Sequence, residues 1–390
     1  MVFATRIYEP EPAAAAFRLR AAVGALAADG VEVEVLTTRP PRSIAAAANV
    51  PGIKVRRWPV LRDRNQYVRG YLCYLSFDIP LIVRLLTVRR SDVVVVEPPP
   101  TTGAVVRAIC ALRRIRYVAY LPDVWSDGAA GAGAPGFVVK VVTVLERATM
   151  RGARRVITVT PEQAQRAIDL FGLRQDQIAV VRNGIDTSLF SADGPPALDV
   201  PAGPYAIYAG TISEWQGADV FVRAWPKVLS QLPDATLVFL GHGSAGQTLA
   251  QLRDDLGLPP ESVQLRSLVS PAEAAAWQRG ARVALASMQP GQQYDYFLPT
   301  KVFAGAACGT PVLFAGPGPG GELVKSERLG QAVAHDVEVV AAALVAMLAA
   351  PSDESVREHL VNWAREHADI NRAGQQAARI IEEVAAATRL

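Results

Sequence analysis

Three kinds of residue in this chain have types and positions suited to chemistry. Glycine-rich turns follow several apolar runs, Lys301 stands just after a proline, and Asp123 follows the apolar run Tyr117–Leu121. Glycine lets the main chain approach a diphosphate, lysine supplies a cation, and a carboxylate can accept a hydroxyl proton. These residues together favour a site for a phosphorylated ligand and a hydroxyl-bearing partner.

The sharpest signal is the segment 295–313. Pro299 is predicted to begin a helix, Gly309 to end it and Pro311 to begin the next strand. Lys301 then lies in the first helical turn, where backbone N–H groups already favour phosphate. The alternative is a solvated surface lysine.

Three further turns carry the same signal, at Gly210–Gly217, Gly241–Gly243 and Gly316–Leu323. Such turns are frequent in α/β proteins, so each is weak alone, but together they outline one edge of a sheet. Glu322 in the third turn is suited to sugar hydroxyls or to complementing a helix dipole.

The N-terminal half offers two loops after predicted strands. In the first, Tyr8–Arg20, the helix start and Arg18 favour a phosphate or sugar, although an alanine-rich packing helix is equally compatible. In the second, Asp123 is the candidate for contacting an acceptor hydroxyl, and aspartate is also common in plain turns. The glycine-rich stretch Gly128–Gly136 that follows is predicted to be a mobile loop.

Short Val/Ile-rich runs alternate with helical periodicity, which predicts parallel sheets flanked by helices and an α/β class. The predicted strands are 1–5, 31–37, 53–58, 92–97, 117–121, 156–159 and 178–181, then 205–209, 235–240, 262–265, 283–286, 311–314 and 331–334. The predicted helices of the first half are 13–28, 66–86, 102–113, 137–151 and 161–171. Two doubly wound sheets facing a central cleft would bind ligands at their strand C-termini.

The chain of 390 residues is long enough for two domains. A polar, Pro/Gly-rich stretch after Val181 predicts domains at 1–190 and 191–365, and we expect a C-terminal helix, 366–390, to pack back on the first domain. No secretion signal or membrane span is visible, and the three cysteines are widely spaced, so we expect a cytoplasmic protein.

Charge is divided unevenly along the chain. The first 190 residues hold 26 Lys and Arg against 16 Asp and Glu, a net charge of +10, whereas the remainder holds 14 against 21, a net charge of −7. A basic half favours an anionic partner: a membrane surface, a phosphorylated acceptor or the acidic half itself. Interleaved aromatic and basic motifs of nucleic-acid binding are not apparent, so no nucleic acid is expected.

Several segments, in their order, resemble glycosyltransferase family four proteins of the GT-B fold, of the bacterial surface-polysaccharide branch. The resemblance spans nearly the whole chain and is carried by Val181–Phe190, Tyr208–Thr211 and Leu298–Phe303, with support from Glu11–Pro12, Phe17–Arg20 and Asp123–Trp125.

The resemblance implies a retaining transferase that moves a hexose or deoxyhexose from a nucleotide diphosphate sugar to a glycan or lipid-diphosphate acceptor. No metal or other cofactor is expected. The implied catalytic residue is Asp123; the implied donor-binding residues are Gly210, Thr211, Gln216, Gly217, Gly241, Gly243, Leu298, Pro299, Thr300, Lys301, Gly320, Gly321, Glu322 and Leu323; and the implied acceptor-binding residues are Pro12, Ala13, Arg18, Trp125 and Asp127.

The chain departs from the family pattern in two places. Thr211 and Gln216 stand where the family commonly has an arginine and a lysine, and Lys301 with Arg18 could supply the missing charge. Tyr296 and Ala304 stand in place of a pair of glutamates, the second of which holds the nucleotide ribose. Ala304 suggests a dTDP-sugar as the donor, because a deoxyribose lacks the 2′-hydroxyl and has less need of that carboxylate.

The segment 65–90 interleaves aromatic and aliphatic residues with arginines. This mixture suits peripheral contact with an anionic membrane at the inner face of the plasma membrane, or packing under a sheet. Two other functions stay open: a non-catalytic GT-B-like partner of an active transferase, which the lost glutamates would permit, and a sugar-nucleotide epimerase.

Overall fold

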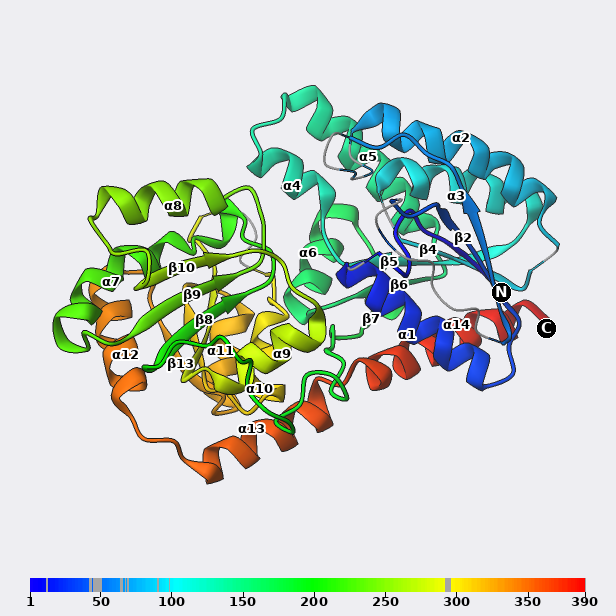
Figure 1. Cartoon of the computed structure of the whole chain (residues 1–390). Coiled ribbons are helices and arrows are strands. Elements are labelled where there is room, and N and C mark those ends of the chain that lie inside the picture. Colours follow the sequence, from blue (N-terminus) through cyan, green and yellow to red (C-terminus); the bar gives the residue numbers. More distant parts are fainter. Residues whose placement is uncertain are drawn as a thin grey trace. The chain divides into compact units, whose positions relative to one another are not determined.

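The computed structural model describes residues 1–389 except 12, 42–43, 45–50, 64–65, 67, 69, 90, 98 and 292–295. It divides into two compact units. Unit 1 holds Met1–Asn183 and Ile370–Leu390, and unit 2 holds Gly184–Asp369 (Figure 1). The sequence predicted the divisions after residues 190 and 365, and the structure places them after 183 and 369.

Unit 1 is built on a seven-stranded, all-parallel sheet in the order β3-β2-β1-β4-β5-β6-β7. Its strands are β1 Val2–Ala4, β2 Val33–Thr38, β3 Ile53–Trp58, β4 Val93–Val96, β5 Arg116–Leu121, β6 Arg155–Thr158 and β7 Ile178–Val180. The four valines of β4 are all buried, as expected for a central strand covered by helices on both faces.

The helices of unit 1 are α1 Ala14–Ala28, α2 Tyr71–Thr87, α3 Pro100–Arg113, α4 Trp125–Gly131, α5 Gly136–Gly152, α6 Pro161–Phe171 and α14 Ile370–Arg389. The last helix lies along α1 (Figure 1) and adds Ala377, Ile381 and Val384 to the core that holds Leu19 and Val23. Gly374 permits this contact, because a Cβ there would lie 2.5 Å from the backbone of Ala21.

Unit 2 is built on a six-stranded, all-parallel sheet in the order β10-β9-β8-β11-β12-β13. Its strands are β8 Tyr205–Ala209, β9 Thr236–Leu240, β10 Val263–Arg266, β11 Val283–Ser287, β12 Val312–Ala315 and β13 Gly330–Val333. Its helices are α7 Asp219–Gln231, α8 Gly246–Asp255, α9 Pro271–Gly280, α10 Lys301–Ala307, α11 Pro319–Ser326, α12 Val337–Ala349 and α13 Glu354–His367. Both units are therefore doubly wound, Rossmann-like α/β folds.

Each predicted strand overlaps an observed strand, but three helical predictions need correction. Helix α2 begins at Tyr71, not at residue 66, and α10 begins at Lys301, with Pro299 two residues before it. Residues 128–131, predicted as the start of a mobile loop, form the second half of α4.

Within the described residues, we find no single helix that is long and apolar enough to cross a membrane. The helices α12 and α13 meet that length and composition only as a pair, and the pair is bent by 112°.

Candidate functional site

Lys301 is held against the turn that follows β8. It is the first residue of α10, and its Nζ donates a hydrogen bond to the carbonyl oxygen of Thr211 at 2.9 Å. The same Nζ lies 4.7 Å from the centre of the Tyr208 ring. Burial lowers the pKa of Lys301 to about 7. The lysine is thus a partly desolvated cation attached to the predicted donor turn.

Gln216 shapes this turn from within. Its side-chain Oε1 accepts hydrogen bonds from the Tyr208 hydroxyl at 2.8 Å and from the Ser213 N–H at 3.3 Å. Gly217 follows in a left-handed conformation, with φ of 63°, and its carbonyl lies 2.8 Å from Nε2 of His335. Gln216 and Gly217, both predicted to bind the donor, therefore fix the turn that carries Thr211.

The turns after β8 and β9 pack against each other through glycines. Gly210 donates its N–H to the carbonyl of Leu240 at 2.8 Å. A Cβ on Gly241 would lie 2.0 Å from the Gly210 carbonyl oxygen, and a Cβ on Gly243 would lie 1.9 Å from that of Ile212. No real Cβ approaches so closely, so the contact between the two turns requires both glycines.

The turn after β12 leads into α11. A Cβ on Gly320 would lie 2.4 Å from the Phe314 ring, whereas Gly321 leaves more room, with the ring 3.3 Å from its Cβ position. Leu323 is buried in the core beside α10, but the Glu322 side chain is 82% exposed and 4.0 Å from Lys325. Glu322 is thus free to meet a ligand.

The segment before α10 connects the site to the core. Leu298 is buried in the same cluster as the apolar residues of α10, and Pro299 and Thr300 lead directly into the helix. Ala304 is buried on this helix. The ring of Phe297 packs edge-to-face on Trp215, with ring centres 5.2 Å apart. This aromatic pair, from two loops that border the site, was not singled out by sequence reasoning.

In unit 1, Arg18 is buried and already paired. It forms an ion pair with Glu97, at the C-terminal end of β4, and its other terminal nitrogen donates to Oδ1 of Asn183 at 2.9 Å. The cation predicted for a phosphate or sugar is thus largely neutralised by Glu97, which sequence reasoning missed. The only available signal was its place directly after an apolar strand.

Asp123 follows β5 and lies in the electrostatic field of the same pair. Burial raises the pKa of Asp123; the charge of Arg18 opposes this shift and that of Glu97 adds to it. A carboxyl group with a raised pKa at a strand end is suited to exchange a proton. Arg18, Glu97 and Asp123 form the polar cluster of this sheet edge.

The remaining predicted acceptor residues have different surroundings. Trp125 packs edge-to-face on Tyr74, with ring centres 6.2 Å apart. Asp127 is buried and forms two hydrogen bonds with Arg166, at 2.7 and 2.9 Å, so its carboxylate is occupied. Ala13 is the half-buried residue before α1, and Pro12 lies outside the described residues.

Helix α4 begins at a buried carboxylate. The side chain of Glu146, on α5, accepts the backbone N–H groups of Trp125 at 2.7 Å and of Ser126 at 2.8 Å. It thereby satisfies the free donors of the α4 N-terminus in place of a local cap. Burial raises the pKa of Glu146 to about 7. Glu146 therefore positions the start of α4, close to Asp123 in the chain.

We expect Glu146→Gln to change how stability depends on pH. The pKa of Glu146 in the folded protein lies above its ordinary value of about 4.5, so the folded wild type binds more protons than the unfolded chain and loses stability as pH rises from about 4.5 to 7. The free energy of unfolding should fall by at most about 3 kcal/mol over that window. Urea titrations at several pH values should show this slope in the wild type and a flatter profile in Glu146→Gln; equal slopes would contradict the assignment.

Among the described residues, no group of three or more His, Cys, Asp or Glu side chains is arranged to hold a metal ion.

Solved structures share this architecture over nearly its whole length. Sucrose-phosphate synthase from Thermosynechococcus elongatus superposes with a TM-score of 0.78 at 17% identity, covering 99% of both chains. HepE from Anabaena, in complex with UDP and glucose, superposes with a TM-score of 0.69 at 17% identity, covering 98% of this chain and 99% of its own. Two Rossmann-like units with parallel sheets form the GT-B fold of glycosyltransferases.

Each of the two units matches a model of a glycosyltransferase family. A model described as glycosyl transferase 4-like domain matches residues 14–184, and one described as glycosyl transferases group 1 matches residues 203–350. The chain belongs to this family of glycosyltransferases.

Curated relatives bear the same kind of name. The D-inositol 3-phosphate glycosyltransferase of Acidothermus cellulolyticus is 29% identical over 57% of this chain, and the match spans about half of that enzyme, 51%. That of Jonesia denitrificans is 28% identical, again over about half of its length, 54%. That of Thermomonospora curvata is 25% identical over 88% of this chain and 83% of its own length.

Proposed function

We propose that this protein is a retaining, metal-independent glycosyltransferase. It moves a sugar from a nucleotide diphosphate sugar to a glycan or lipid-linked acceptor in bacterial surface polysaccharide or glycoconjugate synthesis. The observation that carries the proposal is Lys301, a partly desolvated cation whose Nζ is held 2.9 Å from the Thr211 carbonyl oxygen, beside two glycine turns that pack closely together.

A donor diphosphate suits this arrangement because its charge would restore the protonated form of Lys301 that burial disfavours. Thr211 and Gln216 carry no charge, and Lys301 brings a cation to this turn, with its Nζ 2.9 Å from the Thr211 carbonyl oxygen. The bound UDP of HepE, a protein of the same fold, supports a nucleotide as the ligand.

An anionic or phosphate-bearing acceptor suits the basic first half of the chain. The curated relatives are named for D-inositol 3-phosphate, which is a phosphorylated compound. Asp123, with its raised pKa, would orient the acceptor hydroxyl. We place the reaction in the cytoplasm, where nucleotide sugars would be the donors.

The nucleotide is tested by calorimetric titration with UDP, GDP, dTDP and ADP. Because Ala304 leaves α10 without the carboxylate that would hold a ribose hydroxyl, we expect dTDP to bind at least as tightly as UDP. Preferential binding of UDP or GDP would reject the deoxyribose hypothesis and keep the transferase. Binding of none of the four would reject the donor site itself.

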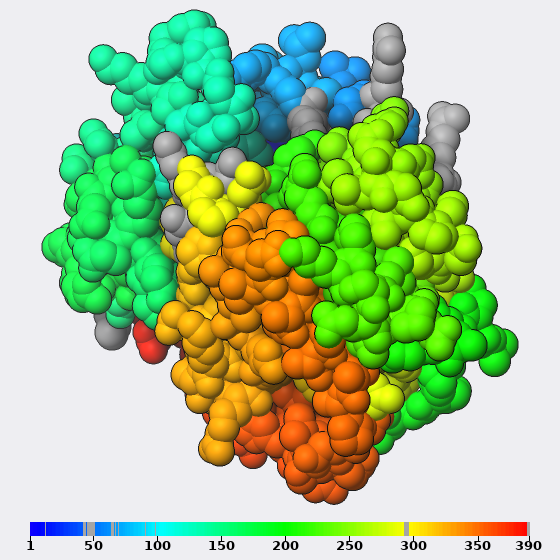
Figure 2. Space-filling view, turned by 90° about the vertical axis from the view of Figure 1, so that its left-hand side faces the viewer, coloured from blue at the N-terminus to red at the C-terminus, as the bar shows by residue number. Residues whose placement is uncertain are grey.

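For unit 1, which we propose to bind the acceptor, we also propose contact with an anionic membrane. Exposed apolar side chains follow one another at helical spacing on α2 and on α5, and both helices pack against α3. They include Leu72 and Phe137, each 73% exposed, and further Leu75, Ile79, Val83, Val141 and Val144. Figure 2 shows these helices on one face of unit 1, with α4 and α5 in teal and α2 in blue.

We expect Leu72→Ser combined with Phe137→Ser to reduce binding to phosphatidylglycerol vesicles about tenfold or more, since each buried apolar side chain contributes about 1.5–3 kcal/mol. Vesicle sedimentation measures the effect. Leu198→Ser, at a fully exposed leucine of unit 2, is the matched control. Unchanged sedimentation of the double variant would remove these helices from membrane contact.

A second candidate is a non-catalytic partner of an active transferase. The observation that favours it is that Tyr296 and Ala304 stand where the resemblance implies two glutamates. A protein that binds a nucleotide sugar but releases no nucleotide from it, alone or with an acceptor extract, would support this candidate.

A further inference from the structure

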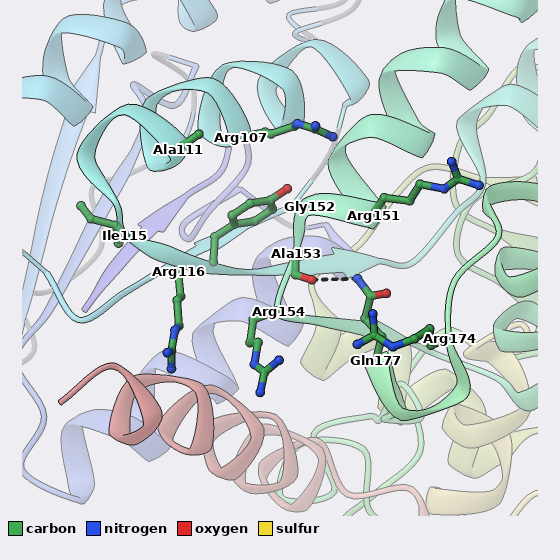
Figure 3. A pocket seen from close by; sticks show the side chains of 11 residues that line it. Arg107, Ala111, Ile115, Arg116, Arg151, Gly152, Ala153, Arg154, Arg174 and Gln177 are labelled. Carbon is green, nitrogen blue, oxygen red and sulfur yellow. Dashed lines mark hydrogen bonds between the residues drawn. The ribbon is translucent and has the colours of Figure 1, made fainter. Parts of the chain in front are cut away.

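Unit 1 has a cavity at the sheet edge opposite to Asp123. It has a volume of about 390 Å³ and opens where β5 and β6 begin, between the C-terminal ends of α3 and α5 (Figure 3). Asp123 follows the other end of β5, so this cavity is separate from the polar cluster described above.

Five arginines line the cavity, and no acidic residue is among its lining residues. They are Arg107, Arg116, Arg151, Arg154 and Arg174. Figure 3 shows Arg107 and Arg151 in the upper part of the view, and Arg116 and Arg154 side by side in its lower part. The arginines thus surround the cavity from two sides.

Four of these charges are not neutralised within the described residues. Arg174 is ion-paired with Asp176. Arg107 and Arg151 donate to the backbone carbonyls of Ala148 and Phe171, which fixes the guanidinium groups without cancelling their charge. For Arg116 and Arg154 the described part of the chain provides no ionic partner, and Glu382 and Glu383 of the neighbouring α14 form none with them.

Helix dipoles explain only part of this concentration of charge. The C-terminal ends of α3 and α5 each contribute about half a negative charge. Four arginines therefore leave an excess of roughly three positive charges around one cavity. An anion of two to four charges would balance this excess.

The chemistry of the lining selects phosphate over a base or an apolar group. Guanidinium groups form paired hydrogen bonds with phosphate oxygens. Tyr117, the aromatic residue of the lining, is buried, and its hydroxyl donates to the Thr149 carbonyl at 2.6 Å, so it offers no face for base stacking. We infer that this cavity is a second anion site, which binds a phosphate-bearing group such as a diphosphate through Arg116, Arg154, Arg107 and Arg151.

The test is a calorimetric titration of the full chain with inorganic pyrophosphate. Arg116→Gln with Arg154→Gln should weaken binding about tenfold or more, since charge-assisted hydrogen bonds contribute about 1.5–3 kcal/mol each. Both side chains are exposed, so the melting temperature should not change. Arg223→Gln, at an exposed arginine of unit 2, is the matched control. Lys301→Ala removes pyrophosphate binding at the donor turn and should leave this site intact.

A second titration, with phosphatidylglycerol vesicles, distinguishes binding of a free phosphate from binding of a lipid headgroup. Loss of vesicle binding in the double variant, with no binding of pyrophosphate to the wild type, would assign the site to the headgroup of an anionic lipid such as phosphatidylglycerol. Loss of pyrophosphate binding in the double variant would assign the cavity to a soluble anion. Pyrophosphate and vesicle affinities that the double variant leaves unchanged, or pyrophosphate binding that only Lys301→Ala removes, would overturn the inference.

Discussion

Lys301→Ala is expected to weaken binding of the preferred nucleotide diphosphate by about 10- to 100-fold, because a charge-assisted contact to phosphate contributes about 1.5–3 kcal/mol. The turn after β8 would then be left with the uncharged residues Thr211 and Gln216. Isothermal titration calorimetry measures the change. Lys227→Ala is the control, because this lysine is exposed and paired with Glu338 on α12.

The same lysine should make binding depend on pH. Its pKa of about 7 in the free protein would rise on contact with the diphosphate, so binding takes up a proton above pH 7. The affinity should therefore fall with rising pH between about 7.5 and 9.5, by up to tenfold per unit. Lys301→Ala should abolish this dependence. A wild-type affinity that is constant over that range would show that Lys301 does not meet the phosphate.

Gly241→Ala, in the turn after β9, is expected to destabilise unit 2 strongly. Gly241 has a φ of 155°, and a Cβ would lie 2.0 Å from the carbonyl oxygen of Gly210. Backbone strain and overpacking each cost about 1–3 kcal/mol, which corresponds to a loss of roughly 5–20 °C in melting temperature for a unit of this size. Nucleotide binding should fall as well, because the displaced turn carries Thr211.

Gly246→Ala supplies the matched control. Gly246 lies five residues further on, at the start of α8, and its Cβ position has no atom within 4 Å. Alanine there should leave stability unchanged or raise it by about 0.5–1 kcal/mol. Thermal unfolding followed by circular dichroism compares the two variants. Similar melting temperatures would show that the turns after β8 and β9 are free to separate.

The strands could be predicted because each is a short apolar run between polar turns, and a parallel sheet buries such runs on both faces. Helix α4 could not be predicted in this way. Its sequence from Trp125 to Gly131 is rich in glycine and alanine, and its N-terminus is satisfied by Glu146, twenty residues further along the chain. A cap supplied from another helix leaves no local signal.

The candidate site shows the same limit. Lys301 could be predicted to lie in the first turn of a helix near glycine-rich turns, because proline, lysine and glycine mark that segment locally, although the helix begins at Lys301 and not at Pro299. The pairing of Arg18 with Glu97, and of Asp127 with Arg166, joins residues distant in sequence. An isolated charge in the sequence therefore looks available to a ligand when the fold has already given it a partner.

Unit 1 is assembled from two separate stretches of the chain, and this affects the order in which the protein can be made. Residues 184–369 are contiguous, so the core of unit 2 can close while the chain is still being synthesised. The core of unit 1 cannot be completed, and the apolar face of α1 stays uncovered, until Ile370–Arg389 has left the ribosome. Helix α14, which is translated after all of unit 2, is thus the element that completes unit 1, and the nascent N-terminal half depends on it for protection from aggregation.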